Sequence, residues 1–86
     1  MKQFSYVIKD ELGIHARPAG LLAKKAKSYA DTAVTITANG KTVNLGQLMK
    51  LMALGVKQGT EVTITCDGAA EDEACAGLKA FLEENL

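Results

Sequence analysis

The chain has 86 residues, and its ten basic and ten acidic side chains give a formal net charge of zero. This length allows one small domain with a single core, which we expect to span residues 1–86. A net charge of zero disfavours a nucleic-acid-binding protein, and no apolar run approaches the roughly 20 residues of a membrane span. Because Met1-Lys2-Gln3 leads directly into a predicted strand and not into a signal sequence, we expect a cytoplasmic protein that does not insert into a membrane.

The first third of the chain predicts a strand followed by a helix. Apolar residues alternate with others over residues 4–8, which is typical of a strand with one buried face. A helix is then expected from His15 or Ala16 to Tyr29 or Ala30. Its core-facing positions, at helical spacing, are Ala19, Leu22, Ala23, Ala26 and Tyr29.

The remaining elements predict an α+β fold. Turns are expected at residues 31–32, 39–40 and 67–68, where Asn39-Gly40 is typical of a tight hairpin. Strands are expected over residues 34–37, 41–44 and 61–66. Helices are expected over residues 47–54 and 70–86. The order β-α-β-β-α-β-α predicts a two-layer open-faced sandwich in which three helices pack on one face of a four-stranded sheet.

The two cysteines are not expected to bind a metal. Cys66 and Cys75 lie nine positions apart, form no C-x-x-C motif and have one histidine to share. Cys66 alternates with apolar residues of its strand, and Cys75 lies three residues before Leu78, so both are predicted to be small core residues. The core stripe of the last helix would be Cys75, Leu78, Phe81 and Leu82. A structural disulfide is the alternative.

The segment Gly13-Ile14-His15-Ala16-Arg17-Pro18-Ala19-Gly20 contains the only histidine, the only arginine and the only proline of the chain. Pro18 is tolerated in the first turn of a helix and not further in, so His15 should lie at a helix N-terminus. Unpaired backbone N–H groups and the positive end of the helix dipole favour an anion there. The arginine side chain presents a planar fork of donors that suits a phosphoryl group. These features together predict an imidazole that carries a phosphoryl group.

Charge is unevenly distributed along the chain. Residues 12–60 contain seven basic residues and Asp31 as their only acidic one, whereas residues 61–86 contain seven acidic residues and Lys79 as their only basic one. The half that contains His15 is therefore basic. We expect partners with acidic docking faces, and an association that weakens with added salt.

The predicted helix over residues 47–54 is more apolar than a short helix on a small domain needs. Leu51 and Leu54 can supply its buried stripe, so Leu48, Met49 and Met52 cannot all be inside. An exposed patch with flexible methionines suits successive docking of several partners. The alternative is a helix that is simply buried on most sides.

Three segments of the chain stand out together, namely Gly-Ile-His-Ala-Arg-Pro-Ala (residues 13–19), Asn-Gly-Lys-Thr-Val-Asn-Leu (39–45) and Leu-Gly-Val (54–56). With these segments the chain resembles the histidine-containing phosphocarrier (HPr) family of the bacterial phosphoenolpyruvate:sugar phosphotransferase system. The resemblance implies an antiparallel sheet, and a carrier that is not itself an enzyme. It implies that His15 accepts a phosphoryl group on Nδ1 from phospho-Enzyme I and passes it to EIIA domains of sugar permeases, with Arg17 supporting the transfer.

The same resemblance implies a docking surface on the first two helices and no cofactor. Matching positions are Pro18, Gly20, Lys24, Lys27, Gln47, Leu48, Lys50 and Met52. We expect a monomer.

One position departs from the pattern of many Gram-positive members, which carry a regulatory serine at the start of the second helix. Gln47 occupies that place here, and no serine or threonine lies between Val43 and Gly59. We therefore expect no control by a kinase at this helix, and a family paralogue with a regulatory or non-sugar role is one alternative. A small RNA-binding module with a similar element order is a second alternative, although the chain has only four aromatic residues for base stacking.

Overall fold

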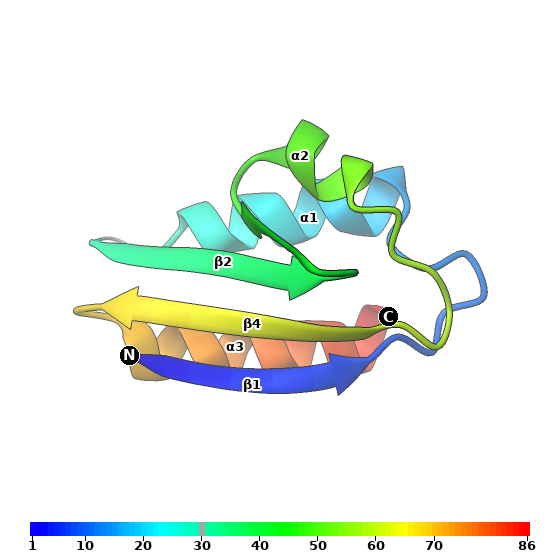
Figure 1. The fold of residues 1–86 in the computed structure, drawn as a ribbon. Helices are drawn as coiled ribbons and strands as arrows, with labels where there is room; N and C mark the ends of the chain where they lie inside the picture. Colours follow the sequence, from blue (N-terminus) through cyan, green and yellow to red (C-terminus); the bar gives the residue numbers. More distant parts are fainter. Residues whose placement is uncertain (30) are drawn as a thin grey trace.

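The computed structural model describes residues 1–29 and 31–86 and contains a four-stranded sheet with three helices (Figure 1). All neighbouring strands are antiparallel, in the order β1-β4-β2-β3. The elements are β1 (Lys2–Val7), α1 (Ala16–Lys27), β2 (Thr32–Ala38), β3 (Lys41–Asn44), α2 (Leu48–Ala53), β4 (Glu61–Gly68) and α3 (Glu71–Asn85). The predicted α+β class and element order are confirmed.

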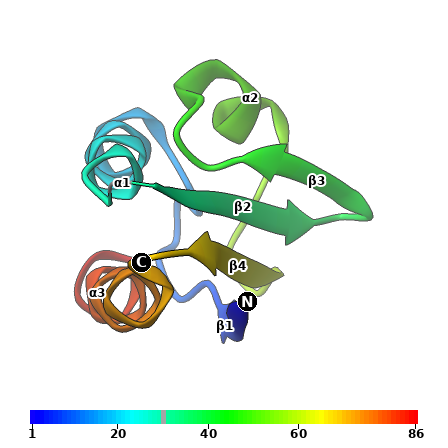
Figure 2. The same ribbon diagram turned by 90° about the vertical axis from the view of Figure 1, so that its left-hand side faces the viewer.

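Helices α1 and α3 cover one face of the sheet, and α2 packs beside α1 near β3 (Figure 2). The other face is open and carries paired hydroxyl groups. Ser5 and Thr63 lie 3.1 Å apart, and Thr37 and Thr42 lie 2.7 Å apart, in each case between side-chain oxygens. All four aromatic residues pack against the core, so the open face presents hydroxyl groups where a base-stacking sheet needs rings.

The core lies between the sheet and the helices. Period-two alternation directs Val62, Ile64 and Cys66 of β4 inward, where each is fully buried. Ile64 pairs with Ile36 of β2 in the register of the sheet. The helices contribute buried residues at helical spacing, namely Ala19, Leu22, Ala23 and Ala26 from α1, and Ala74, Leu78 and Leu82 from α3.

Some predicted boundaries were wrong. Helix α1 ends at Lys27, before the predicted Tyr29, because the amide and hydroxyl of Ser28 both donate to the Lys25 carbonyl and close the last turn. Ala30, the other predicted end, lies outside the described residues. The Asp31-Thr32 turn is shorter than predicted, because Thr32 already pairs with Gly68 in the sheet.

The end of β4 was also misplaced. The predicted turn at Asp67-Gly68 is the last part of the strand, since both residues pair with β2, and the turn falls at residues 69–70. In α3, Ala74 is fully buried, whereas Cys75 and Phe81 are only partly buried against the core. The buried stripe of α3 therefore begins at Ala74, one residue before the predicted Cys75.

Both cysteines are free thiols, so the disulfide alternative is wrong for this structure. Burial raises the pKa of the Cys66 thiol to about 12, and hydrogen bonding with Cys75 adds to the rise. Cys66 is thus a small core residue, as predicted.

The hairpin between β2 and β3 holds α2 in place. Asn39 and Gly40 have positive φ angles of 52° and 77°, as a tight two-residue hairpin turn requires. The Asn39 side-chain amide donates to the Leu54 carbonyl at 3.0 Å. This bond ties the end of α2 to the sheet and fixes the side of the helix that faces solvent.

Within the described residues, no helix combines the length and apolar character that crossing a membrane would take.

Candidate functional site

His15 lies immediately before α1, at its N-cap position. Its backbone is extended, with φ −117° and ψ 176°, and its carbonyl accepts the Ala19 amide at 2.9 Å. No side chain of the described residues caps the helix. The amides of Ala16 and Arg17 have no acceptor among the described residues, and Pro18 has no amide hydrogen. The helix start therefore offers two free N–H groups beside the histidine.

The loop before His15 is anchored to the segment that follows α2. Gly13 has φ +68°, a conformation that side chains disfavour, and its Cα lies close to the backbone of Val56 and Lys57. The amide of Ile14 donates to the Val56 carbonyl at 3.1 Å, and the Ile14 side chain is buried. After the buried pair Gly13 and Ile14, His15 is the residue at which the chain returns to the surface.

An open cavity of about 240 Å³ contains the His15 side chain. Its lining residues come from three parts of the chain: Asp10 from the loop, His15, Arg17, Pro18 and Leu21 from α1 and its cap, and Asn85 from the end of α3. The His15 side chain is 36% exposed, which leaves the ring accessible to a reacting group. Arg17 is exposed and forms no ion pair with any described residue. Its guanidinium is therefore available to an anion.

Sequence reasoning missed Asp10, Leu21 and Asn85 as parts of this site. Asp10 lies in the loop between β1 and α1, and nothing in its spacing along the sequence indicates contact with His15. Asn85 reaches the site because the end of α3 docks on that loop: the amides of Lys9 and Asp10 donate to the Leu86 main-chain oxygen at 2.6 and 2.7 Å. This contact joins the two ends of the chain, so no local pattern encodes it.

Helix α2 exposes the apolar side chains that were expected to be surplus to the core. Leu51 is fully buried and Leu54 nearly so, whereas Leu48, Met49 and Met52 are 39%, 81% and 38% exposed. The alternative of a helix buried on most sides is therefore wrong. Gln47 caps this helix and is exposed, as is Lys50. Because α2 packs against α1, these residues and Lys24 belong to adjacent helices (Figures 1 and 2).

Not every predicted docking residue is equally placed. Pro18 is buried and reaches the surface only as a wall of the His15 cavity. Gly20 is half-buried, with open space where a Cβ would be. Lys27 lies at the far end of α1, about 18 Å from its start by helical rise.

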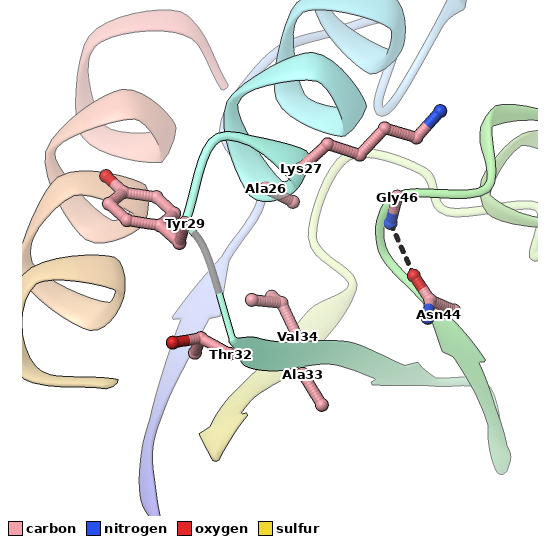
Figure 3. Close-up of a pocket in the computed structure, with 8 residues that line it drawn as sticks. All are labelled: Ala26, Lys27, Tyr29, Thr32, Ala33, Val34, Asn44 and Gly46. Atoms are coloured by element: carbon pink, nitrogen blue, oxygen red, sulfur yellow. Dashed lines mark hydrogen bonds between the residues drawn. The ribbon is translucent and has the colours of Figure 1, made fainter. Parts of the chain in front are cut away.

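Lys27 lines a second cavity of about 210 Å³, between the end of α1, the start of β2 and the segment before α2 (Figure 3). In this cavity the Asn44 side chain accepts the Gly46 amide at 2.8 Å, and Tyr29 points toward α3 (Figure 3). The described lining residues include no histidine, cysteine or acid. Of these two cavities, the first is the one lined by a histidine, an arginine and an acid.

The two halves of the fold differ in charge. Helix α1 carries Arg17, Lys24, Lys25 and Lys27, whereas α3 begins with Glu71, Asp72 and Glu73. Among the described residues there is no group of three histidine, cysteine or acidic side chains that could hold a metal ion.

A half-open sandwich with one accessible histidine beside free helix amides suits a protein that carries an anionic group. Comparison with known proteins gives the same class. Residues 2–84 match the family model described as PTS HPr component phosphorylation site. The phosphocarrier protein HPr of Mycoplasma genitalium is 44% identical over 85 residues, covering 99% of this chain and 97% of that protein.

Solved structures agree. A structure of a mycoplasma histidine-containing phosphocarrier protein has a TM-score of 0.92 and 42% identity, and the alignment covers 96% of this chain and 93% of that one. A structure described as an HPr dimer from Thermoanaerobacter tengcongensis has a TM-score of 0.77 and 34% identity, with 98% and 95% covered. The chain belongs to the PTS HPr family. It is a phosphocarrier of the phosphotransferase system and not an enzyme.

Proposed function

We propose that His15 is the residue that carries the phosphoryl group, bound through Nδ1. Phospho-Enzyme I donates the group, and EIIA domains of sugar permeases receive it. The observation that carries this proposal is the position of the only histidine, which is partly exposed in an open cavity at the start of α1, beside Arg17.

The surroundings of His15 suit a group that must be held and then released. A neutral imidazole nitrogen attacks phosphorus, so that an N–P bond forms while the bond to the donor breaks and its electron pair stays with the donor. The free amides of Ala16 and Arg17, the helix dipole and the guanidinium stabilise the negative charge. These groups are accessible and few, so they can stabilise the transition state without making the phosphorylated form too stable to pass its group on.

Incubation of the purified protein with phosphoenolpyruvate and Enzyme I tests the proposal. Intact mass should rise by one phosphoryl group, the modification should be lost in acid, and peptide mapping should place it on His15. A phosphoryl group on any other residue, or no gain in mass, would contradict the proposal.

Replacing Arg17 by alanine should slow phosphoryl transfer by about 100-fold, because a preorganised donor to the charged group is lost. The side chain is exposed and has no ion-pair partner among the described residues, so the thermal stability should not change. Stopped-flow or quench-flow measurement of transfer from phospho-Enzyme I provides the rate. Arg17→Lys keeps the charge but loses the planar fork, and we expect it to recover only part of the rate. Equal rates for wild type and Arg17→Ala would remove this role.

We further propose that partners dock on a surface formed by α1, by α2 with its cap and by the wall of the His15 cavity. It comprises Pro18, Gly20, Lys24, Lys27, Gln47, Leu48, Lys50 and Met52. What supports this surface is the exposure of Leu48 and Met52 next to lysines on adjacent helices. Apolar contact supplies affinity there, while the lysines steer a partner with an acidic face.

Lys50→Glu should weaken binding to Enzyme I by about tenfold at low salt, mainly through a slower association rate. The control is Lys79→Glu, which makes the same change of charge on the exposed surface of α3. Surface plasmon resonance at two salt concentrations gives the association and dissociation rates of both variants. Equal losses for the two variants would show that only net charge matters and would reject the docking surface.

An ATP-dependent HPr kinase should leave residues 43–59 unmodified, because Gln47 offers no hydroxyl group and no serine or threonine lies between Val43 and Gly59. Gln47 is exposed at the N-cap of α2, so a hydroxyl there would be accessible. Gln47→Ser is therefore the matched variant, and its phosphorylation would show that the missing hydroxyl alone explains the result. A phosphate mapped to residues 43–59 of the wild type would contradict the prediction.

We also propose that the chain acts as a single domain, a monomer, in the cytoplasm. One continuous cluster of buried residues joins the sheet to all three helices, which supports a single domain. Light scattering of the purified protein distinguishes a monomer from a dimer of the kind described for the Thermoanaerobacter tengcongensis relative.

A further inference from the structure

The carboxylate of Asp10 faces one nitrogen of the His15 ring. Asp10 Oδ1 lies 3.8 Å from His15 Nε2, and both side chains line the same cavity. This separation is too long for a hydrogen bond but short enough for a direct electrostatic interaction. The two side chains are 31% and 36% exposed, so water screens the interaction only in part.

Asp10 is held in this position by three hydrogen bonds. Its amide donates to the Leu86 main-chain oxygen at 2.7 Å, and its carbonyl accepts the Gly13 amide at 2.9 Å. Its Oδ1 atom accepts the Leu12 amide at 2.8 Å. The last bond needs only an oxygen, which asparagine would supply equally well. The structure of the turn therefore requires the side-chain oxygen of Asp10 but not its negative charge.

We propose that Asp10 is a positioning residue that keeps the ring proton of His15 on Nε2, so that Nδ1 presents its lone pair to phosphorus. A carboxylate can only accept, so it favours the tautomer with hydrogen on the nitrogen that faces it. The inference rests on the proposed role of His15 as the phosphoryl acceptor and assigns which group selects its reactive nitrogen.

The same charge acts on both directions of transfer. When Nδ1 forms the N–P bond, the bond to the phosphorylated donor breaks with its electron pair on the donor, and the ring keeps its Nε2 proton and becomes cationic. When the recipient attacks, the N–P bond breaks, the electron pair returns to Nδ1, and a neutral ring with hydrogen on Nε2 remains. Asp10 stabilises the cationic ring between these steps, because its carboxylate has the opposite charge.

Two charged groups line the cavity around the ring, Asp10 from the loop and Arg17 from α1. The residue contributed by α3, Asn85, is neutral and donates through its side-chain amide to the Phe81 carbonyl at 3.0 Å. Arg17 disfavours a cationic ring and favours the phosphoryl anion, whereas Asp10 does the reverse. The two side chains thus have opposite electrostatic effects on the phosphorylated imidazole.

The test compares Asp10→Asn with Glu11→Gln. Asp10→Asn keeps the oxygen that accepts the Leu12 amide and removes the charge. Glu11→Gln removes the same charge from the next residue, which is exposed and makes no hydrogen bond or ion pair with any described residue. Two readouts are used: ring ¹⁵N chemical shifts of His15, which report the tautomer, and the rate of phosphoryl loss from the isolated phosphoprotein as a function of pH.

Asp10→Asn should lower the share of the tautomer with hydrogen on Nε2. It should also make phosphoryl loss about threefold slower, because the cationic ring loses a stabilising negative charge. Glu11→Gln should match the wild type in both readouts. If Asp10→Asn does not fold, Asp10→Ser replaces it, because a hydroxyl can also accept the Leu12 amide.

Identical ring signals and pH–rate profiles for wild type and a folded Asp10 variant would overturn the inference and leave the role of His15 intact. Phosphorylation of the wild type at a residue other than His15 would instead overturn the proposed function. Peptide mapping of every phosphorylated variant separates these two outcomes.

Discussion

Replacement of His15 by alanine is expected to abolish phosphorylation by phosphoenolpyruvate and Enzyme I, with no phosphoprotein detected by intact mass. The chain has one histidine, so no second imidazole can take its place. The backbone contribution of residue 15 to α1 does not depend on its side chain, because the Ala19 amide donates to its carbonyl. The free energy of unfolding should therefore change by less than about 1 kcal/mol.

Binding separates a chemical role of His15 from a docking role. If partners dock on α1 and α2 as proposed, His15→Ala should bind Enzyme I with a Kd within about twofold of the wild type, since most of the contact area is elsewhere. Lys50→Glu should show the opposite pattern, with weakened binding but phosphorylation that is recovered at high Enzyme I concentration. Residual phosphorylation of His15→Ala would mean that another residue carries the group.

Gly13→Ala is expected to lower the stability of the protein more than Gly55→Ala does. Gly13 has φ +68°, and a Cβ at this position would overlap the Val56 carbonyl oxygen and lie 2.7 Å from Lys57 Cα. Both obstacles are backbone atoms, so no side chain can rotate away. The left-handed conformation costs about 1–2 kcal/mol and the overlap about 1–3 more, so a loss of about 3 kcal/mol is expected. For a domain of this size that is a fall in Tm of roughly 15 °C.

Gly55→Ala is the matched control. Gly55 has the same φ of +68°, but a Cβ there would meet nothing within 4 Å. Its substitution should cost about 1 kcal/mol, which reflects the backbone conformation alone. The difference in Tm between the two variants, measured by calorimetry, therefore gives the part of the Gly13→Ala destabilisation that comes from steric overlap. Similar Tm values for the two variants would show that the contact with residues 56 and 57 is not tight.

Gly13→Ala should also slow phosphorylation, although residue 13 does not line the cavity. Displacing this residue breaks the bond from the Ile14 amide to the Val56 carbonyl and shifts the loop that carries Asp10 and His15. Gly55→Ala should leave the phosphorylation rate unchanged at temperatures where both variants are folded.

The part of the site that could be predicted from the sequence is the part that is local in the chain. His15, Arg17 and Pro18 fall within four residues, and the proline alone restricts the helix start to their neighbourhood. Exposure of the apolar residues of α2 could be predicted as well, because a six-residue helix buries only one stripe. In both cases a short-range rule decides the outcome.

The rest depended on contacts between distant parts of the chain. Asp67-Gly68 has the composition of a turn, but pairing with β2 extends the strand through both residues. Asp10 and Asn85 meet at the cavity because Leu86 accepts two amides from the loop after β1. Loop composition could indicate that Asp10 is polar and accessible. It could not indicate which side chain Asp10 would face.

The separation of charge between the helices gives this uncharged molecule an electric dipole, with its positive side on α1 and its negative side on α3. The field of an approaching acidic partner exerts a torque on a dipole, although the net charge of the molecule is zero. The molecule therefore rotates to present α1 before the surfaces touch. Productive collisions become more frequent in this way, while non-specific attraction to the abundant polyanions of a cell stays low.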